Sequence, residues 1–135
     1  ITDKRMTRFI MTLAEACAFI VQAITDMEGG EIFVPSQLSA MRLMDLATVI
    51  GGSVVEIGLR PGGEKLHERL LSDDEPKRTI EQEGRLLIMP PHRTWTEAPY
   101  AAYSPQTART TYSSDQGPFV SQQNLALLLQ EEPER

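Results

Sequence analysis

The sequence predicts a mixed α/β fold with a small sheet. Apolar residues at helical spacing follow Thr12, and runs rich in β-forming residues alternate with helical stretches. The predicted order is helix, strand, helix, strand and short helix, which is typical of α/β or α+β architecture. Because a pair of strands alone is marginally stable in water, we expect this sheet to pack on a larger one.

The first predicted helix covers residues 13–27. Thr12 and Glu15 form a capping-box pattern, and Gly29-Gly30 follows the last apolar position. Cys17 lies on the apolar stripe of this helix, so we expect it to be buried rather than reactive.

The remaining chain divides into short predicted elements and an arm. The elements are, in chain order, a strand over 31–34 that Pro35 stops, a helix over 40–50 capped by Ser39, a strand over 53–59, a helical segment over 64–71, a strand over 85–89 and a helix over 122–130. Residues 91–120 show no periodicity and predict an extended arm over the surface. Residues 121–135 then form the terminal helix and a frayed tail.

Composition limits the classes of function. The chain has 135 residues and a net charge of -6, which argues against general nucleic-acid binding because a basic face supplies most of that affinity. No apolar run reaches the length of about 18 residues that a membrane span needs, and no secretory signal is visible. The single cysteine excludes a disulfide scaffold and indicates a reducing, cytoplasmic compartment.

Several catalytic motifs are absent from the sequence. It contains no G-x-G-x-x-G turn, no phosphate loop, no cysteine pair for zinc, no G-x-S-x-G elbow and no tyrosine with a lysine four residues later. Residues alone therefore do not predict a complete enzyme. Since the chain opens at Ile1 in a polar, basic segment, we expect it to be a piece of something longer, with the missing chemistry upstream.

The best candidate for a binding site is the segment RPGGEK at residues 60–65. It leaves a predicted strand end, where ligands sit in α/β folds. Arg60 offers a planar fork for the paired oxygens of a diphosphate, and Glu64 offers an acceptor for ribose hydroxyls. The alternative is an ordinary strand-to-helix turn with Arg60 solvated and Glu64 at a helix start.

The other candidates have simpler structural explanations. Lys4, Arg5 and Arg8 alternate with apolar residues and form a second candidate for an anion site, although a solvated terminus explains them better. His67 is more readily a structural hydrogen-bonder than a catalyst, because no base or nucleophile is paired with it. The acidic run at 73–75 beside a proline predicts a solvated turn rather than a metal site.

Four motifs in order resemble one family. They are ITDKRMTRF at 1–9 with the following helix, GEIFVP at 30–35, GLRPG at 58–62 with EKLHE at 64–68, and YSSD at 112–115. Together they resemble the C-terminal part of the inverting UDP-N-acetylglucosamine 4,6-dehydratases. These are extended short-chain dehydrogenase/reductases close to the CapD-like polysaccharide biosynthesis proteins. The likeness covers residues 1–90, returns at 112–115 and is weak on the arm between.

The resemblance implies a substrate-binding lobe over residues 1–90, with the Rossmann domain missing. NADP would be bound by that missing N-terminal domain, which would oxidise the sugar at C4, remove water across C5–C6, return hydride to C6 and invert C5. By position, Arg60 resembles the family's diphosphate-binding arginine and Glu64 its ribose-contacting acid, while Arg8 is a weaker candidate for a nucleotide contact. The resemblance further implies a UDP-sugar substrate, a homo-oligomer when full-length, no bound metal, and no turnover by this chain alone.

The sequence departs from the family pattern at two positions. Gly63 is an extra residue, which places Arg60 and Glu64 one position further apart, and Ile10 stands where the family often has tryptophan.

Two other functions stay open. The chain could instead belong to a related nucleotide-sugar epimerase or reductase, which product analysis would distinguish. It could also be a non-catalytic interaction module, which the upstream coding sequence would distinguish by lacking a glycine-rich strand-turn-helix.

Overall fold

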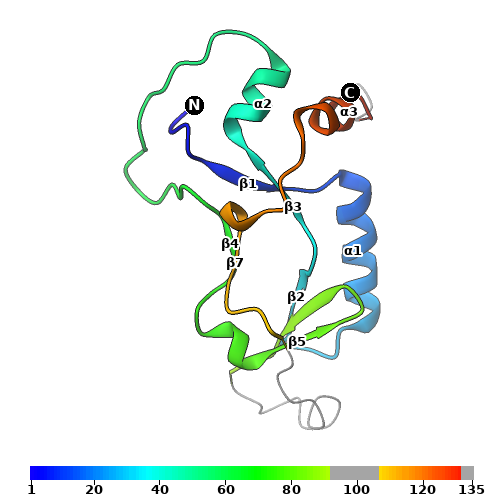
Figure 1. Ribbon diagram of the computed structural model, residues 1–135. Coiled ribbons are helices and arrows are strands. Elements are labelled where there is room, and N and C mark those ends of the chain that lie inside the picture. Colours follow the sequence, from blue (N-terminus) through cyan, green and yellow to red (C-terminus); the bar gives the residue numbers. More distant parts are fainter. Residues whose placement is uncertain (92–106, 132–135) are drawn as a thin grey trace. The chain divides into compact units, whose positions relative to one another are not determined.

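The computed structural model describes residues 1–91 and 107–131. Its helices and strands are, in chain order, β1 (Thr7–Ile10), α1 (Leu13–Asp26), β2 (Ile32–Pro35), β3 (Ser39–Arg42), α2 (Leu43–Ile50), β4 (Arg69–Leu71), β5 (Thr79–Gln82), β6 (Arg85–Ile88), β7 (Tyr112–Ser113) and α3 (Gln122–Glu131) (Figure 1). This mixture of helices and strands confirms the predicted α/β character. The chain divides into two compact units. The first unit contains residues 1–12, 38–68 and 113–135, and the second contains 13–37 and 69–112.

In the first unit, β1 pairs with β3 in antiparallel register, so that Arg8 lies opposite Met41. Helix α2 begins directly after β3, and its first N–H, that of Leu43, donates to the Met6 carbonyl over 3.0 Å. The fully buried side chains of Met6 and Leu125 belong to the core of this unit. Burial of these apolar side chains is the main stabilising contribution here.

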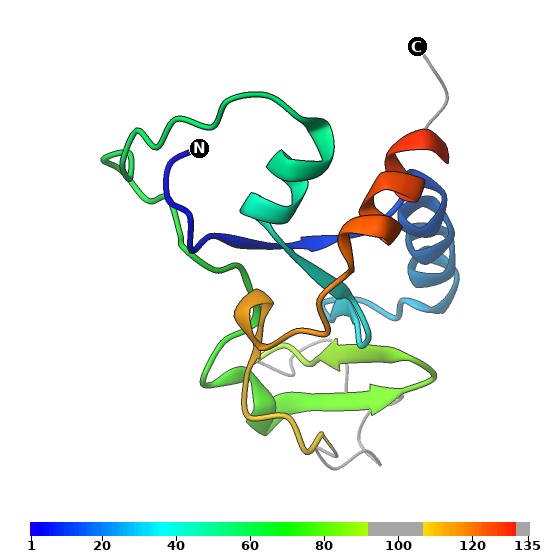
Figure 2. The ribbon, with the colours of Figure 1, turned by 45° about the horizontal axis from the view of Figure 1, so that its top comes forward.

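In the second unit, β6 is the central strand of a three-stranded sheet, with β2 and β5 on its two sides (Figure 2). Both pairings are antiparallel. The turn between β5 and β6 has Glu83 at φ 51° and Gly84 at φ 76°. Positive φ at both central residues is the type I′ geometry that matches strand twist in tight hairpins. Every residue of β6 is buried, as expected for the middle strand.

The second unit also buries an arginine. Arg85 forms ion pairs with Asp26 at the end of α1 and with Glu83, and its guanidinium lies 5.8 Å from the centroid of the Phe33 ring. A buried guanidinium requires such partners because its desolvation is costly. The pairing attaches the end of α1 to the β5–β6 hairpin.

Two predicted elements are wrong, for related reasons. Residues 53–59 form no strand, because they have no ladder of backbone pairs with a described strand: Ile57 donates to the Ile1 carbonyl, and the Ile1 amine donates to the Val55 carbonyl. Residues 64–71 form no helix, because β1 uses their backbone groups. The Leu66 carbonyl accepts from the Thr7 N–H over 3.0 Å, and residues 69–71 become β4, paired with β7.

Boundaries shift at other elements. The second helix begins at Leu43 rather than at residue 40, because Ser39–Arg42 pairs with β1. The strand predicted over 31–34 is confirmed as β2, which ends with Pro35 as its last residue, one position later than predicted. The helices predicted over 13–27 and 122–130 are confirmed as α1 and α3, and the strand over 85–89 is confirmed as β6. Of the predicted arm, residues 92–106 lie outside the described residues, and the described part carries β7.

The prediction that Cys17 is buried is wrong. Cys17 is exposed, and α1 has no buried residue. The large apolar side chains that α1 exposes are Leu13, Ile20, Val21 and Ile24. The apolar stripe therefore has helical spacing, as predicted, yet its large side chains stay exposed within the described residues. Within residues 1–91 and 107–131, no helix is both long and apolar enough to cross a membrane.

Candidate functional site

Arg60 and Glu64 lie on the loop that follows residues 53–59 of the first unit. The Arg60 side chain is exposed, and its guanidinium forms no hydrogen bond or ion pair with the described residues. The Arg60 backbone N–H donates to Glu64 Oε2 over 3.2 Å. Gly62 and Gly63 between them have φ values of 105° and 114°, which strongly favour glycine. A hydrogen bond between Arg60 and Glu64 therefore joins the two ends of the loop, while the Arg60 guanidinium has no hydrogen-bond or ion-pair partner among the described residues.

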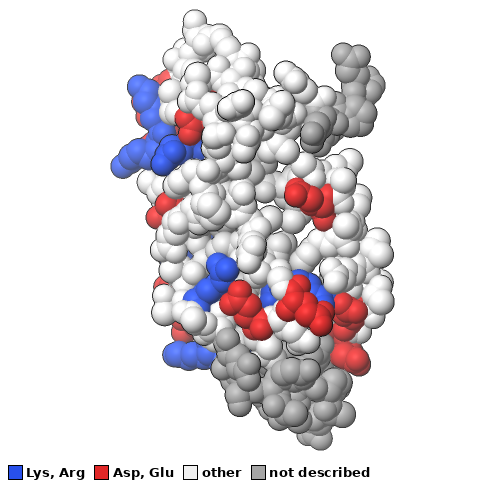
Figure 3. All heavy atoms as spheres, turned by 45° about the vertical axis from the view of Figure 1, so that its right-hand side comes forward, with Lys and Arg blue, Asp and Glu red and all other residues white. Residues whose placement is uncertain are grey.

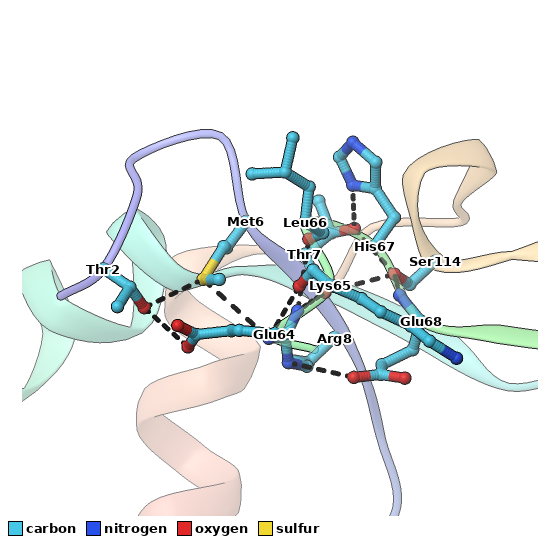
Figure 4. A network of polar contacts seen from close by, with 10 residues as sticks. All are labelled: Thr2, Met6, Thr7, Arg8, Glu64, Lys65, Leu66, His67, Glu68 and Ser114. Carbon is cyan, nitrogen blue, oxygen red and sulfur yellow. Dashed lines mark hydrogen bonds and ion pairs between the residues drawn. The ribbon is translucent and has the colours of Figure 1, made fainter. Parts of the chain in front are cut away.

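The other oxygen of the Glu64 carboxylate has a partner at the N-terminus of the chain. The hydroxyl of the buried Thr2 donates to Glu64 Oε1 over 2.8 Å (Figure 4). This hydrogen bond is the main reason that the pKa of Glu64 lies below its ordinary value, and the Arg60 N–H contributes further. Sequence reasoning did not identify Thr2, because a threonine 62 positions away from its partner gives no local signal.

Arg8 lies beside this loop but is occupied by contacts within the chain. Its Nη1 donates to the Thr7 and Leu66 carbonyls over 2.7 and 3.1 Å, and its Nη2 donates to the Lys65 carbonyl over 3.0 Å. Its Nε lies 3.6 Å from Glu68 Oε1. These contacts hold residues 65–68 against β1, so the structure gives Arg8 a positioning function. A direct nucleotide contact by Arg8 stays a prediction.

A second polar cluster adjoins the same segment. Thr7 Oγ1 lies 2.8 Å from His67 Nδ1 and 2.7 Å from Ser114 Oγ. Ser114 Oγ accepts from the Glu68 N–H over 2.9 Å and donates to the Thr7 carbonyl over 3.1 Å. Thr7 and Ser114 are buried, and His67 is half-buried. Sequence reasoning noted Thr7 and Ser114 only as members of their motifs and gave neither a role, although both contribute hydrogen bonds that position His67.

The other basic residues of the N-terminus have acidic partners. Lys4 Nζ lies 3.4 Å from Glu56 Oε2, and Arg5 Nη2 lies 2.7 Å from Asp3 Oδ2. Lys4, Arg5 and Arg8 therefore do not form one unpaired cationic group. On the face shown in Figure 3, lysine and arginine side chains lie in groups beside acidic ones rather than as a continuous basic surface. No group of three or more potential metal ligands occurs among the described residues.

The hydrogen bonds between Asp3 and Arg5 lower the pKa of Asp3 from 3.8 to about 2. Because this pKa is depressed in the folded state, ionised Asp3 stabilises the fold above pH 3.8, and the contribution is lost as the pH falls to about 2. We expect Asp3→Asn to remove this part of the acid-unfolding profile. Circular dichroism of both proteins across that range measures it, and an Asn variant with the wild-type slope would contradict the assignment.

The geometry defines a mixed α/β protein whose first unit presents an arginine-bearing loop held by buried polar residues. A family model described as polysaccharide biosynthesis protein matches residues 1–90, so the chain belongs to that family. This confirms that the motifs indicated a protein of the polysaccharide biosynthesis family.

Individual relatives agree with the family. Over 92 residues, 67% of this chain, it is 40% identical to a UDP-N-acetylglucosamine 4,6-dehydratase (inverting) from Campylobacter jejuni and covers 27% of that protein. It is 37% identical over 84 residues to the capsular polysaccharide biosynthesis protein CapD from Staphylococcus aureus, covering 56% of this chain and 14% of CapD. The X-ray structure of Pen from Bacillus thuringiensis matches 98% of the chain with a TM-score of 0.77 and 29% identity, over 39% of Pen. The chain thus matches well under half the length of each relative.

Proposed function

We propose that this chain is the UDP-sugar-binding C-terminal portion of a C5-inverting UDP-N-acetylglucosamine 4,6-dehydratase. The similarity to the Campylobacter protein supports the reaction class, and the short share of that relative that the chain covers supports a portion rather than the whole enzyme. In this proposal a preceding Rossmann domain binds NADP, which supplies the hydride chemistry. This chain carries no glycine-rich phosphate-binding turn, so it holds no cofactor and does not turn over alone.

The observation that carries the proposal is the unpaired Arg60 fork on a loop that Glu64 closes. Each Glu64 oxygen accepts one hydrogen bond, Oε1 from the Thr2 hydroxyl and Oε2 from the Arg60 N–H, and each keeps a second lone pair as an acceptor. A guanidinium binds a diphosphate through paired N–H donors, and it does so best when its loop is already ordered. The Arg60 guanidinium would donate paired hydrogen bonds to the diphosphate of the UDP-sugar, and Glu64, on the same loop, would accept from ribose hydroxyls.

The remainder of the proposal concerns the whole enzyme. We infer that it works in the cytoplasm as a homo-oligomer on a UDP-sugar, and uses neither nucleic acid nor a membrane as a partner. The coding sequence that precedes Ile1 is the first test. It should encode a glycine-rich strand-turn-helix and a tyrosine followed four residues later by a lysine. Their absence would remove the dehydratase assignment.

Direct binding is the second test. Isothermal titration of UDP, with uridine as comparison, into the longest natural polypeptide that contains residues 1–135 should give a tighter complex with UDP. Equal binding of the two ligands would show that no diphosphate site exists. Binding of neither would overturn the proposed function altogether.

The contact between Thr2 and Glu64 gives a separate prediction. Thr2→Val removes the hydroxyl that fixes Glu64 while keeping the shape of the side chain. We expect UDP affinity to fall about 3- to 10-fold, the effect of losing one neutral-to-charged hydrogen bond that acts through the loop. Thr2→Ser keeps the hydroxyl and should bind UDP as the wild type does. If the serine variant fails equally, Thr2 acts only through packing.

A further inference from the structure

The hydrogen bonds around Ser114 determine which nitrogen of His67 carries a proton. The Thr7 carbonyl has no proton, so the Ser114 hydroxyl must donate in that 3.1 Å contact. Ser114 Oγ then has no proton left for Thr7 Oγ1, 2.7 Å away, so the Thr7 hydroxyl donates in that contact. Because the Thr7 hydroxyl already donates its only proton to Ser114, Thr7 Oγ1 is an acceptor in its 2.8 Å contact with His67. The proton in that contact therefore belongs to His67 Nδ1.

This chain of donors leaves every participating oxygen satisfied. Ser114 Oγ accepts from the Glu68 N–H and from Thr7 and donates once, which uses its full capacity. The other tautomer of neutral His67 would break one of the three contacts that join Ser114, Thr7 and His67. Neutral His67 therefore has a lone pair on Nε2.

The Nε2 atom has no hydrogen-bond partner among residues 1–91 and 107–131. Figure 4 shows the imidazole at the border of the polar network, with the second ring nitrogen turned away from Thr7 and Ser114. The ring belongs to the same segment as Glu64, and Arg8 holds that segment through the Lys65 and Leu66 carbonyls. An imidazole whose one nitrogen is held by buried hydroxyls presents the other nitrogen in a defined direction.

We propose that His67 is a ligand-binding residue of the same lobe, whose Nε2 accepts a hydrogen bond from a hydroxyl or amide N–H of the sugar in a nucleotide sugar. This inference rests on the proposed function for its ligand, although the tautomer does not. Thr7 and Ser114 are positioning residues for His67. The diphosphate fork of Arg60 and the acceptor of His67 would then recognise different parts of one ligand.

The tautomer is tested on the 135-residue chain by nitrogen-15 NMR of the histidine rings in mildly alkaline buffer. His67 should show a protonated Nδ1 and an unprotonated Nε2, with His92, the other histidine, as internal reference. Ser114→Ala frees the Thr7 hydroxyl to donate to Nδ1 and should move the proton to Nε2. Thr7→Ser keeps the relay and should keep the wild-type pattern. A protonated Nε2 in the wild type would overturn the inference.

The ligand contact is tested by titrating UDP and UDP-N-acetylglucosamine into the longest natural polypeptide that contains this chain. His67→Asn retains an N–H donor for Thr7 but lacks Nε2. It should bind UDP-N-acetylglucosamine about 3- to 10-fold more weakly, bind UDP unchanged and unfold at the wild-type temperature. An unchanged affinity for both ligands would refute the role of His67 and leave the UDP site intact. If the wild type binds neither ligand, the proposed function has failed, whatever the tautomer.

Discussion

Arg60→Ala should weaken UDP binding about 10- to 100-fold, because a hydrogen bond to a charged group contributes about 1.5–3 kcal/mol. The expected loss of affinity concerns UDP and not uridine. Uridine has no diphosphate, so its affinity should stay unchanged in the same variant. The guanidinium forms no hydrogen bond or ion pair with the described residues, so the variant should unfold close to the wild-type temperature. Calorimetric titration with both ligands measures the difference.

Two further variants make this result specific to the Arg60 fork. Arg60→Lys keeps the charge but lacks the planar pair of donors, so it should recover only part of the affinity for UDP. Arg69→Ala removes an exposed arginine whose partner is Asp73, and changes the net charge by the same amount. It should leave UDP binding unaltered. If Arg69→Ala weakens binding as much as Arg60→Ala, long-range charge and not a diphosphate contact explains the effect.

Leu86→Ala should lower the free energy of unfolding by about 2–5 kcal/mol. Leu86 is fully buried on β6, the strand between β2 and β5, so the substitution leaves a cavity at the middle strand of the sheet. Urea unfolding followed by circular dichroism measures the loss. Because Leu86 belongs to the second unit, the cooperative transition should broaden as well as shift if the units unfold separately.

The matched control is a leucine of the same chemistry on the surface. Leu127 on α3 is 52% exposed, and Leu127→Ala should change the free energy of unfolding by less than about 0.5 kcal/mol. Equal losses from the two substitutions would mean that β6 is not the centre of the second unit's core.

Sequence patterns predicted the elements that local chemistry determines. α1 and α3 have helical spacing of apolar residues, and β6 contains most of the apolar run at 86–89 that precedes a proline. The loop at residues 60–63 was predicted from its proline and glycines, and Glu64, which was predicted to begin a helix, lies on the same short loop. These features depend on neighbours in the sequence.

Features that depend on distant partners could not be predicted. β1 was missed because its strand character comes from pairing with β3, more than thirty residues later, as in the pair Thr7 and Arg42. The helix predicted over 64–71 fails because β1 and Ser114 take its backbone hydrogen bonds. Burial of Cys17 was inferred from an amphipathic stripe, but such a stripe shows only which side is apolar, and α1 keeps that side exposed.

The chain passes between its two units at residues 12–13, 37–38, 68–69 and 112–113. Each unit therefore consists of separate segments of the chain, and segments of the other unit lie between them in the sequence. A single protease cut or gene truncation inside the chain cannot release either half intact, and neither can be transplanted into another protein by one splice. We therefore expect the two units to be inherited together, the Arg60 loop with the β5–β6 hairpin.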